Sequence, residues 1–160
     1  MAKLIFLTQG KYSIVDDEDF EKINQYKWWC RPYNNGNERA VGRVKGKSIF
    51  MHRFILNPPK DIGIDHIDHN GLNNRRENLR LATPSQNQAN SYGKRFGKYS
   101  KFKGVTFNKI GGWQAQIGKN NKMIYLGCFS KEEDAARAYN KAAIKLFGEF
   151  AYLNKIEFAP

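Results

Sequence analysis

The chain has 160 residues, with 27 Lys or Arg against 15 Asp or Glu, so its formal net charge is +12. Because 41% of the residues are hydrophobic and 14% are aromatic, the chain can bury a core, which excludes global disorder, and its length allows one domain or two small ones. No run approaches the roughly 18 apolar residues of a membrane span, and residues 1–8 carry no cleavage signal, so we expect a cytoplasmic protein with no membrane partner.

Residues 1–51 predict a small β-rich scaffold with one helix. The helix opens with four acidic residues, which complement the helix dipole. Trp28 and Trp29 are expected in the core in preference to a base-stacking role, and no reactive site is expected in this region. The predicted elements are strands over 3–8 and 11–15, a helix over 16–26, a strand over 27–31, and a hairpin of 40–44 with 47–51.

Residues 52–91 are dense in Asp, His, Asn and Arg. Strands are predicted over 64–67 and 79–82, and Thr83 and Pro84 are typical of the start of a helix that runs to Asn90. A hairpin followed by a helix would bring the carboxylate of Asp65 and the amide of Asn87 to a common point. Their oxygens are hard ligands suited to Mg²⁺ or Mn²⁺, and the imidazole of His66 could take a proton from an attacking water.

This segment resembles the ββα-metal motif of the HNH homing endonucleases. The matching residues are Asp-His-Ile-Asp-x-Asn at 65–70, Asn-Asn-Arg-x-x-Asn-Leu-Arg at 73–80, the late Asn87, and the preceding Met-His-Arg-Phe at 51–54. The resemblance implies that His66 is the general base, that Asp65 and Asn87 hold one divalent metal, and that Asn78 orients His66 through a hydrogen bond. Asn87 stands where many members have a final His. A phage or mobile intron is the implied origin, and a bacterial host cytoplasm the implied location.

The roles of several other polar residues in the same segment have more than one interpretation. His69 is a spare loop side chain, a phosphate contact or an alternative base. His52 is expected to anchor the element that it starts. Surface charge and phosphate contact are both open for three arginines, with phosphate contact favoured for at least one of Arg75, Arg76 and Arg80. No zinc is expected, because Cys30 and Cys128 have no CxxC partner and are predicted to be small buried side chains.

The positive charge is concentrated toward the carboxyl end. Net charges are +3, +3 and +6 for residues 1–50, 51–95 and 96–160, and residues 98–127 hold six lysines and no acid, interleaved with aromatic side chains. This pattern is typical of nucleic-acid binding, and a merely soluble basic surface is the alternative. Residues 92–101, which include Lys98 and Lys101, lack periodicity and predict a basic linker along the DNA backbone.

Residues 102–160 predict a second module. Three strands are expected over 104–108, 113–118 and 123–129, followed by a helix that opens at Ser130 with a capping box and ends at Gly148. Alanines on the helix let it lie close to the sheet, which leaves the opposite sheet face free to enter a major groove.

This module resembles the Apetala/ethylene-response-factor-type DNA-binding domain. The matching residues are Lys-Gly-Val at 103–105, Trp-x-Ala-x-Ile at 113–117, Tyr-Leu-Gly-x-Phe at 125–129, Glu-Glu-x-Ala-Ala-x-Ala-Tyr at 132–139, Ala142-Ala143, and Phe-Gly-Glu at 147–149 with Asn154. By position, the resemblance places base or phosphate contacts on the sheet. The candidates are Lys103, Thr106, Asn108, Ile110, Gln116, Gly118 and Tyr125, with Lys109, Lys119 and Lys122 as phosphate contacts.

Together these features predict an α+β protein in which residues 1–91 form the scaffold and nuclease module, with an HNH core at 52–91. The expected function is site-specific hydrolysis of duplex DNA with one divalent metal, as a nicking monomer or as a dimer that breaks both strands. Two other classes stay open. One is a non-cleaving DNA-binding regulator with a decayed nuclease module, and the other is an RNA-binding or ribosome-associated basic protein.

Overall fold

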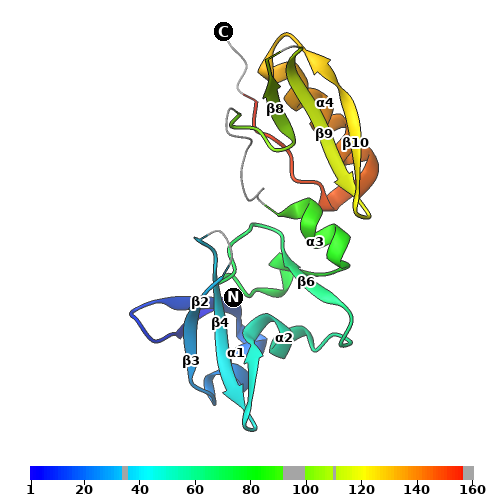
Figure 1. The fold of residues 1–160 in the computed structure, drawn as a ribbon. Helices are drawn as coiled ribbons and strands as arrows, with labels where there is room; N and C mark the ends of the chain where they lie inside the picture. Colours follow the sequence, from blue (N-terminus) through cyan, green and yellow to red (C-terminus); the bar gives the residue numbers. More distant parts are fainter. Residues whose placement is uncertain (34–35, 92–99, 110, 157–160) are drawn as a thin grey trace. The chain divides into compact units, whose positions relative to one another are not determined.

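The structure is a computed structural model, and it describes residues 1–33, 36–91, 100–109 and 111–156 (Figure 1). The chain folds into two compact units, Met1–Pro84 and Ser85–Pro160. Each unit is described by itself.

The first unit begins with a β-hairpin and a helix. Strand β1 (Ala2–Phe6) pairs antiparallel with β2 (Tyr12–Asp16) across a turn in which Gln9 and Gly10 both have positive φ angles. Helix α1 (Asp17–Asn24) follows directly, with three acids in its first turn, where the helix dipole favours negative charge. The predicted hairpin and helix are confirmed.

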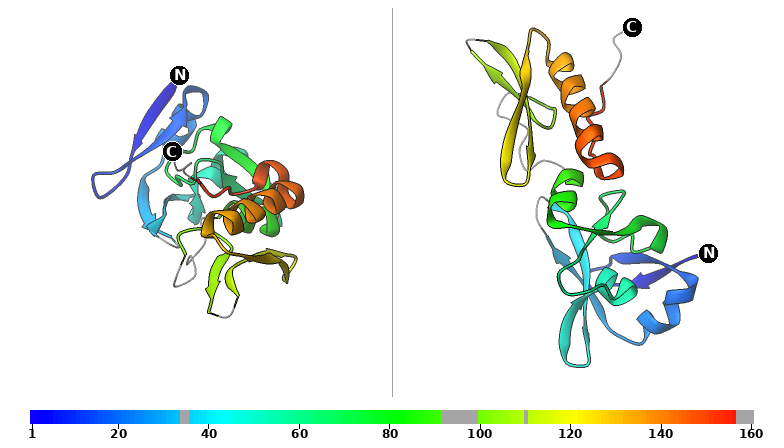
Figure 2. Two further views of the ribbon diagram at one scale, coloured as in Figure 1. Left: turned by 90° about the horizontal axis from the view of Figure 1, so that it is seen from above. Right: turned by 90° about the vertical axis from the view of Figure 1, so that its right-hand side faces the viewer.

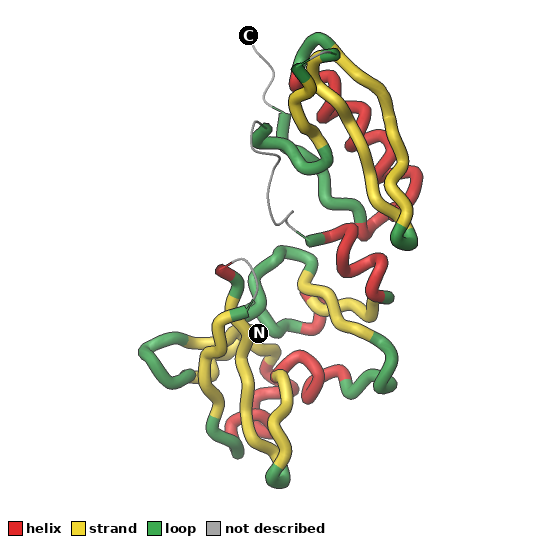
Figure 3. The backbone as a smooth tube through the Cα atoms, viewed as in Figure 1, coloured by secondary structure: helices red, strands yellow, loops and turns green. Residues whose placement is uncertain are grey.

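A three-stranded antiparallel sheet forms the centre of this unit, in the order β3-β4-β5 (Figure 3). Its strands are β3 (Trp28–Pro32), β4 (Glu38–Val44) and β5 (Lys47–Phe50). The turn between β4 and β5 uses Lys45 and Gly46 at φ angles of 48° and 79°, the left-handed pair that a tight hairpin requires. Helix α2 (Met51–Leu56) packs on β4 and β5.

A second hairpin carries the residues expected to do chemistry. Strand β6 (Gly63–His66) pairs antiparallel with β7 (Leu79–Ala82), and the 3₁₀ helix η2 (Arg76–Asn78) leads into β7. Backbone hydrogen bonds from Ile14 to Leu72 and from Asn74 to Ile14, of 2.9 and 2.7 Å, fix the loop between the strands to β2. The core beneath these elements includes Val15, Ile23, Trp28, Met51 and Leu79.

The second unit is a three-stranded antiparallel sheet packed on one helix, in the order β10-β9-β8. It also contains all but the first residue of α3 (Pro84–Asn90). Helix α4 lies along one face of the sheet (Figure 2), where Ala135, Ala136 and Ala143 are buried. The elements are β8 (Val105–Asn108), β9 (Gly112–Lys119), β10 (Lys122–Phe129), α4 (Glu132–Phe147) and η3 (Gly148–Phe150).

Two local predictions are wrong. Helix α4 begins at Glu132, and Lys131 occupies the N-cap position without a side-chain capping bond, so Ser130 does not open the helix. The Glu132 carboxylate instead accepts hydrogen bonds from the hydroxyl of Ser100, at 2.6 Å, and from the amide of Lys101, at 3.2 Å. Cys30 is buried as predicted, but Cys128 is exposed. Within the described part of the chain, no helix is long and apolar enough to cross a bilayer.

Candidate active site and nucleic-acid interface

The β6–β7 hairpin positions Asp65 and His66 at the end of β6. Asp65 lies opposite Arg80 and His66 opposite Leu79. Both polar side chains are buried, with 8% of Asp65 and 2% of His66 exposed. Buried ionisable groups need hydrogen-bonding partners, and here they come from β7 and from the loop that follows β6.

A chain of hydrogen bonds from the first β-hairpin orients the imidazole of His66. The Ser13 hydroxyl donates to the Leu72 carbonyl at 2.8 Å and accepts from the Asn74 amide nitrogen at 2.8 Å. This fixes the Asn74 Oδ1 toward His66, whose Nε2 lies 3.4 Å away. Since an amide oxygen only accepts, Nε2 carries the proton, and Nδ1 holds the lone pair that a general base uses.

The surroundings of His66 favour its neutral form. Burial and the positive charge of Arg39 lower the pKa of His66 to about 4, although Asn74 and Asp68 act in the opposite direction. The His52 ring packs edge-on against that of His66, with centroids 5.1 Å apart, and stacks on Phe50 at 5.3 Å. Burial lowers the pKa of His52 to about 3. Both imidazoles are therefore neutral at pH 7, and His52 packs against the site from the start of α2.

The predicted hydrogen bond between Asn78 and His66 is wrong. The Asn78 amide nitrogen donates to the Asp68 carboxylate and the Asn73 carbonyl, each at 2.8 Å, and its oxygen accepts from the Asp68 backbone at 2.9 Å. Asn78 thus closes the loop after β6, while Asn74 is the residue that faces His66. Asn74 and Asn78 lie four positions apart in one polar segment, and the sequence alone does not show which of them faces His66.

His69 belongs to the same loop. Its φ angle is 65°, and its backbone amide donates to the His66 carbonyl at 3.1 Å. The three alternatives for its side chain stay open.

Asp65 offers carboxylate oxygen, the ligand type that Mg²⁺ prefers. The Arg80 guanidinium holds its Oδ2 through Nε at 2.9 Å and Nη2 at 2.8 Å. No group of three His, Cys, Asp or Glu side chains that could hold a metal converges anywhere in the described ranges. Proteins commonly hold Mg²⁺ by one or two carboxylates, with water and phosphate completing the shell. The Asp65 carboxylate fits such a metal.

Asn87, the other expected metal ligand, lies on α3 and is described with the second unit. Lys103 holds the end of that helix. Its ammonium donates to the carbonyls of Ala89, at 2.6 Å, and Ser91, at 2.7 Å, and contacts that of Gln88 at 3.4 Å. Burial lowers the pKa of Lys103 to about 8, which still leaves it charged at neutral pH. Lys103 therefore caps a helix in this structure, a role that the sequence did not predict.

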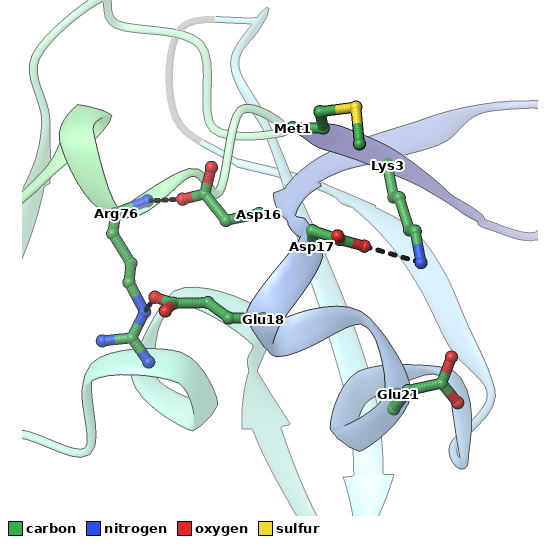
Figure 4. A pocket seen from close by; sticks show the side chains of 7 residues that line it. All are labelled: Met1, Lys3, Asp16, Asp17, Glu18, Glu21 and Arg76. Carbon is green, nitrogen blue, oxygen red and sulfur yellow. Dashed lines mark hydrogen bonds and ion pairs between the residues drawn. The ribbon is translucent and has the colours of Figure 1, made fainter.

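The arginines expected to contact phosphate form intramolecular ion pairs. Arg75 Nε lies 3.0 Å from Asp16, and Arg76 Nε lies 2.7 Å from Asp19. Figure 4 shows Arg76 also reaching Asp16 through its backbone amide and Glu18 through its side chain. Arg80 pairs with Asp65. In this structure Arg75 and Arg76 connect the segment that precedes β7 to β2 and α1, and Arg80 connects β7 to β6.

Arg39 on β4 is different, and the sequence did not single it out. Its side chain is partly buried, and Nη1 contacts the Glu38 carbonyl at 3.4 Å. Its guanidinium carbon lies 5.4 Å from the centre of the Tyr33 ring. A Cβ placed on Gly71 would come within 1.6 Å of Nη1, so the guanidinium lies directly against the loop that follows β6.

One face of the second unit's sheet carries several predicted contact residues. Along β9, Ala115 and Ile117 are buried toward α4, so Gln114 and Gln116 point to the other face. Thr106 lies opposite Gln114 and Tyr125 opposite Gln116, which places all four on this free face. Gln114 was missed, although its alternation with Ala115 in a predicted strand could have revealed it.

The remaining predicted contacts have varied surroundings. Lys119 reaches the Leu146 carbonyl, 3.4 Å away at the end of α4. The ammonium of Lys101 lies 5.3 Å from the Phe102 ring centre. Asn108, Lys109 and Lys122 are exposed. Lys98 and Ile110 lie outside the described residues.

Comparison with known proteins identifies the class of protein to which this site belongs. A family model described as HNH endonuclease matches residues 57–89, the span that contains the β6–β7 hairpin and all but the last residue of α3. An HNH endonuclease of Acanthamoeba polyphaga mimivirus is 36% identical over 156 residues, which cover 94% of this chain and 78% of the viral protein. The chain therefore belongs to the HNH endonuclease family, and it is an endonuclease.

A shorter similarity links the chain to plant proteins. APETALA2-like protein 2 of Oryza sativa subsp. japonica is 51% identical over 57 residues, 34% of this chain and 13% of the rice protein. An AP2-like ethylene-responsive transcription factor of Arabidopsis thaliana is 52% identical over 58 residues, 34% of this chain and 10% of the plant protein. The chain thus spans about a tenth of the length of these relatives. No solved structure matches the chain.

Proposed function

We propose that this endonuclease hydrolyses a phosphodiester bond of duplex DNA at a specific site, with His66 as general base. The observation that carries the proposal is the orientation of His66. A buried, neutral imidazole is held by Asn74 in the tautomer that leaves Nδ1 basic, and it directly follows a carboxylate at the strand end. This arrangement suits the activation of water, because a base must be unprotonated and correctly oriented before it can accept a proton.

In the proposed reaction, Nδ1 of His66 accepts a proton from water as the water oxygen attacks phosphorus. The bond between phosphorus and the leaving oxygen then breaks, and the leaving oxygen takes a proton from solvent. Asn74 keeps the Nε2 proton in place and stabilises the imidazolium that forms. Asn78 acts one step further out by closing the loop that presents Asn74.

The proposed metal ligands are Asp65 and Asn87, which both fall within the span matched by the HNH endonuclease model. A bound Mg²⁺ or Mn²⁺ would supply charge stabilisation at the phosphate and the leaving oxygen. The Arg80 guanidinium fixes the Asp65 carboxylate through Oδ2 and so limits the ways in which Asp65 can turn. No zinc is proposed.

We further propose that the two modules divide the work, with residues 1–91 cutting and residues 102–160 docking on duplex DNA as an Apetala/ethylene-response-factor-type module. The free sheet face supports this assignment because Thr106, Gln116 and Tyr125 share it. A sheet surface of that width can enter a major groove. Lys109 and Lys122, which are exposed, would contact phosphates, and the protein would nick one strand as a monomer.

The test is a nicking assay on supercoiled plasmid and phage genomic DNA with Mg²⁺. Wild type is expected to convert supercoiled to open circular DNA at an initial rate proportional to enzyme concentration, and His66→Ala is expected to lose at least about 10²-fold. His69→Ala is assayed in parallel because His69 is the alternative base, and a loss confined to His69→Ala would contradict the assignment to His66. No nicking by wild type, or equal nicking by His66→Ala, would contradict the proposal. A dimer that breaks both strands would instead produce linear DNA, at a rate that rises with the square of the enzyme concentration.

A further inference from the structure

Arg39 is a guanidinium placed against the proposed active site from an unexpected direction. It comes from β4 in the central sheet, whereas Asp65 and His66 come from β6. Its charge lowers the pKa of both His52 and His66, and the carboxylates of Asp65 and Asp68 are close enough to raise the pKa of Arg39. The contact of its Nη1 with the Gly71 position, in the same loop as the Asn74 that faces His66, places Arg39 beside the site.

The other arginines around the site form ion pairs with carboxylates, whereas Arg39 forms none with the described residues. Arg75, Arg76 and Arg80 each form an ion pair with a carboxylate. Among the described residues, Arg39 has no ion-pair partner, and its side chain makes one hydrogen bond, the 3.4 Å contact to the Glu38 carbonyl. A guanidinium has five N–H donors in a planar fork, so most of the donor capacity of Arg39 is unused.

Unused donors are unusual on a guanidinium that is partly buried, as that of Arg39 is. Moving a charged group out of water is costly unless an opposite charge or hydrogen bonds compensate, and burial does lower the pKa of Arg39 below its ordinary value. The Tyr33 ring and the Gly71 backbone hold the guanidinium in place. Gly71 leaves the space in which Nη1 lies. A partly buried cation whose donors are mostly unused by the described residues, beside a proposed hydrolytic base, is arranged to receive an anion.

We propose that Arg39 binds the scissile phosphate and stabilises the negative charge that develops on its non-bridging oxygens during attack. The inference rests on the proposed function, because it takes the phosphodiester of DNA as the substrate. Phosphoryl transfer depends largely on positioning and on charge stabilisation, and a guanidinium matches two phosphate oxygens with two parallel hydrogen bonds. Arg39 would thus act on the same phosphate that the water activated by His66 attacks.

The experiment compares Arg39→Met with Arg43→Met in the full chain. Arg43 lies four residues along the same strand and is exposed, so its substitution removes the same charge away from the loop. Single-turnover nicking is measured at saturating enzyme with Mg²⁺, and DNA affinity is measured separately with Ca²⁺ in place of Mg²⁺. We expect Arg39→Met to lower the rate about 10²-fold with nearly unchanged affinity. We expect Arg43→Met to leave the rate near that of wild type.

The outcomes separate the inference from the function on which it rests. If wild type does not nick, the proposed function fails. If wild type nicks, His66→Ala does not, and Arg39→Met matches Arg43→Met, only the role of Arg39 is overturned. A loss confined to affinity would also overturn it. Melting temperatures check folding, and if Arg39→Met is unfolded, Arg39→Lys keeps the charge without the fork and must still lose rate at saturating enzyme for the inference to stand.

Discussion

The Nε2 atom of His66 lies 3.4 Å from the Oδ1 atom of Asn74, and the amide nitrogen of Asn74 is held by Ser13 at 2.8 Å. Ser13 stands in β2 and Asn74 in the loop after β6, so residues 61 positions apart set the protonation of one imidazole. Orientation of the proposed base therefore depends on the first hairpin as well as on the nuclease segment.

Asn74→Ala should remove control of the His66 tautomer. We expect the single-turnover nicking rate to fall by at least about 10²-fold, since loss of the group that fixes a catalytic tautomer costs up to about 10⁴-fold. The control is Asn73→Ala, which removes the neighbouring amide and its 2.7 Å bond to Asp68 without touching His66. Rates are compared below the melting temperature of each variant. Equal rates for the two variants would show that Asn74 does not control the base.

Asn78→Ala should destabilise the first unit more than it affects His66 directly. The variant loses three hydrogen bonds that close the loop, which we expect to cost about 2–3 kcal/mol of unfolding free energy. Asn70→Ala, which loses one exposed bond to the Leu72 amide, is the control and should cost less than about 1 kcal/mol. Urea unfolding measures both, and an equal loss would contradict the bridging role of Asn78.

Much of the fold could be predicted because local signals agreed with it. Alternating apolar residues and turn pairs such as Lys45-Gly46 predicted the hairpins, and Gly148 marked the end of α4. Ser130 was misleading because Lys131 takes the N-cap position and the helix begins one residue later than the pattern suggests. The carboxylate of Glu132, the first helical residue, binds Ser100 and Lys101, a contact across 31 or 32 residues that no local pattern reveals.

The site could be predicted only in part. Asp65 and His66 follow from their place at the end of a strand, but the partners of these residues depend on tertiary contacts. Surface charge and phosphate contact were both open for Arg75 and Arg76 in the sequence, because the acids that pair with them lie 57 to 60 residues earlier. Arg39 carried no signal at all, because its position beside the site arises from the packing of β4 against the loop near Gly71.

Asp16→Asn should make the protein less sensitive to acid. Burial raises the pKa of Asp16, but hydrogen bonds from the Arg76 backbone and the Arg75 side chain outweigh this and leave it below the ordinary value. A carboxyl with a lowered folded-state pKa stabilises the protein above its unfolded pKa of about 3.9, and that contribution disappears as the pH falls further. Melting temperatures from pH 7 to pH 2.5 should fall less steeply below about pH 4 for Asp16→Asn than for wild type. Parallel curves would contradict the prediction.

Gly104→Ala should destabilise the second unit through a steric clash. Gly104 has a φ angle of 73°, and an added Cβ would come within 2.2 Å of the Tyr139 ring and 2.5 Å of the Gln116 carbonyl oxygen. Gly46, at a φ of 79° with nothing within 4 Å of its Cβ position, is the control for backbone conformation alone. We expect about 1–2 kcal/mol for Gly46→Ala and clearly more for Gly104→Ala. Equal losses in thermal unfolding would show that the clash is relieved without cost.

Lys103→Met should loosen the end of α3. The variant keeps a long apolar side chain but loses the ammonium that binds the Ala89 and Ser91 carbonyls, so we expect a loss of about 1.5–3 kcal/mol, the contribution of hydrogen bonds to a charged group. Lys109→Met removes one charge from an exposed position and should leave unfolding unchanged. Because α3 carries Asn87, the proposed metal ligand, Lys103→Met should also raise the Mg²⁺ concentration needed for half-maximal nicking. A stable Lys103→Met variant with unchanged Mg²⁺ dependence would show that the cap neither supports the helix nor positions Asn87.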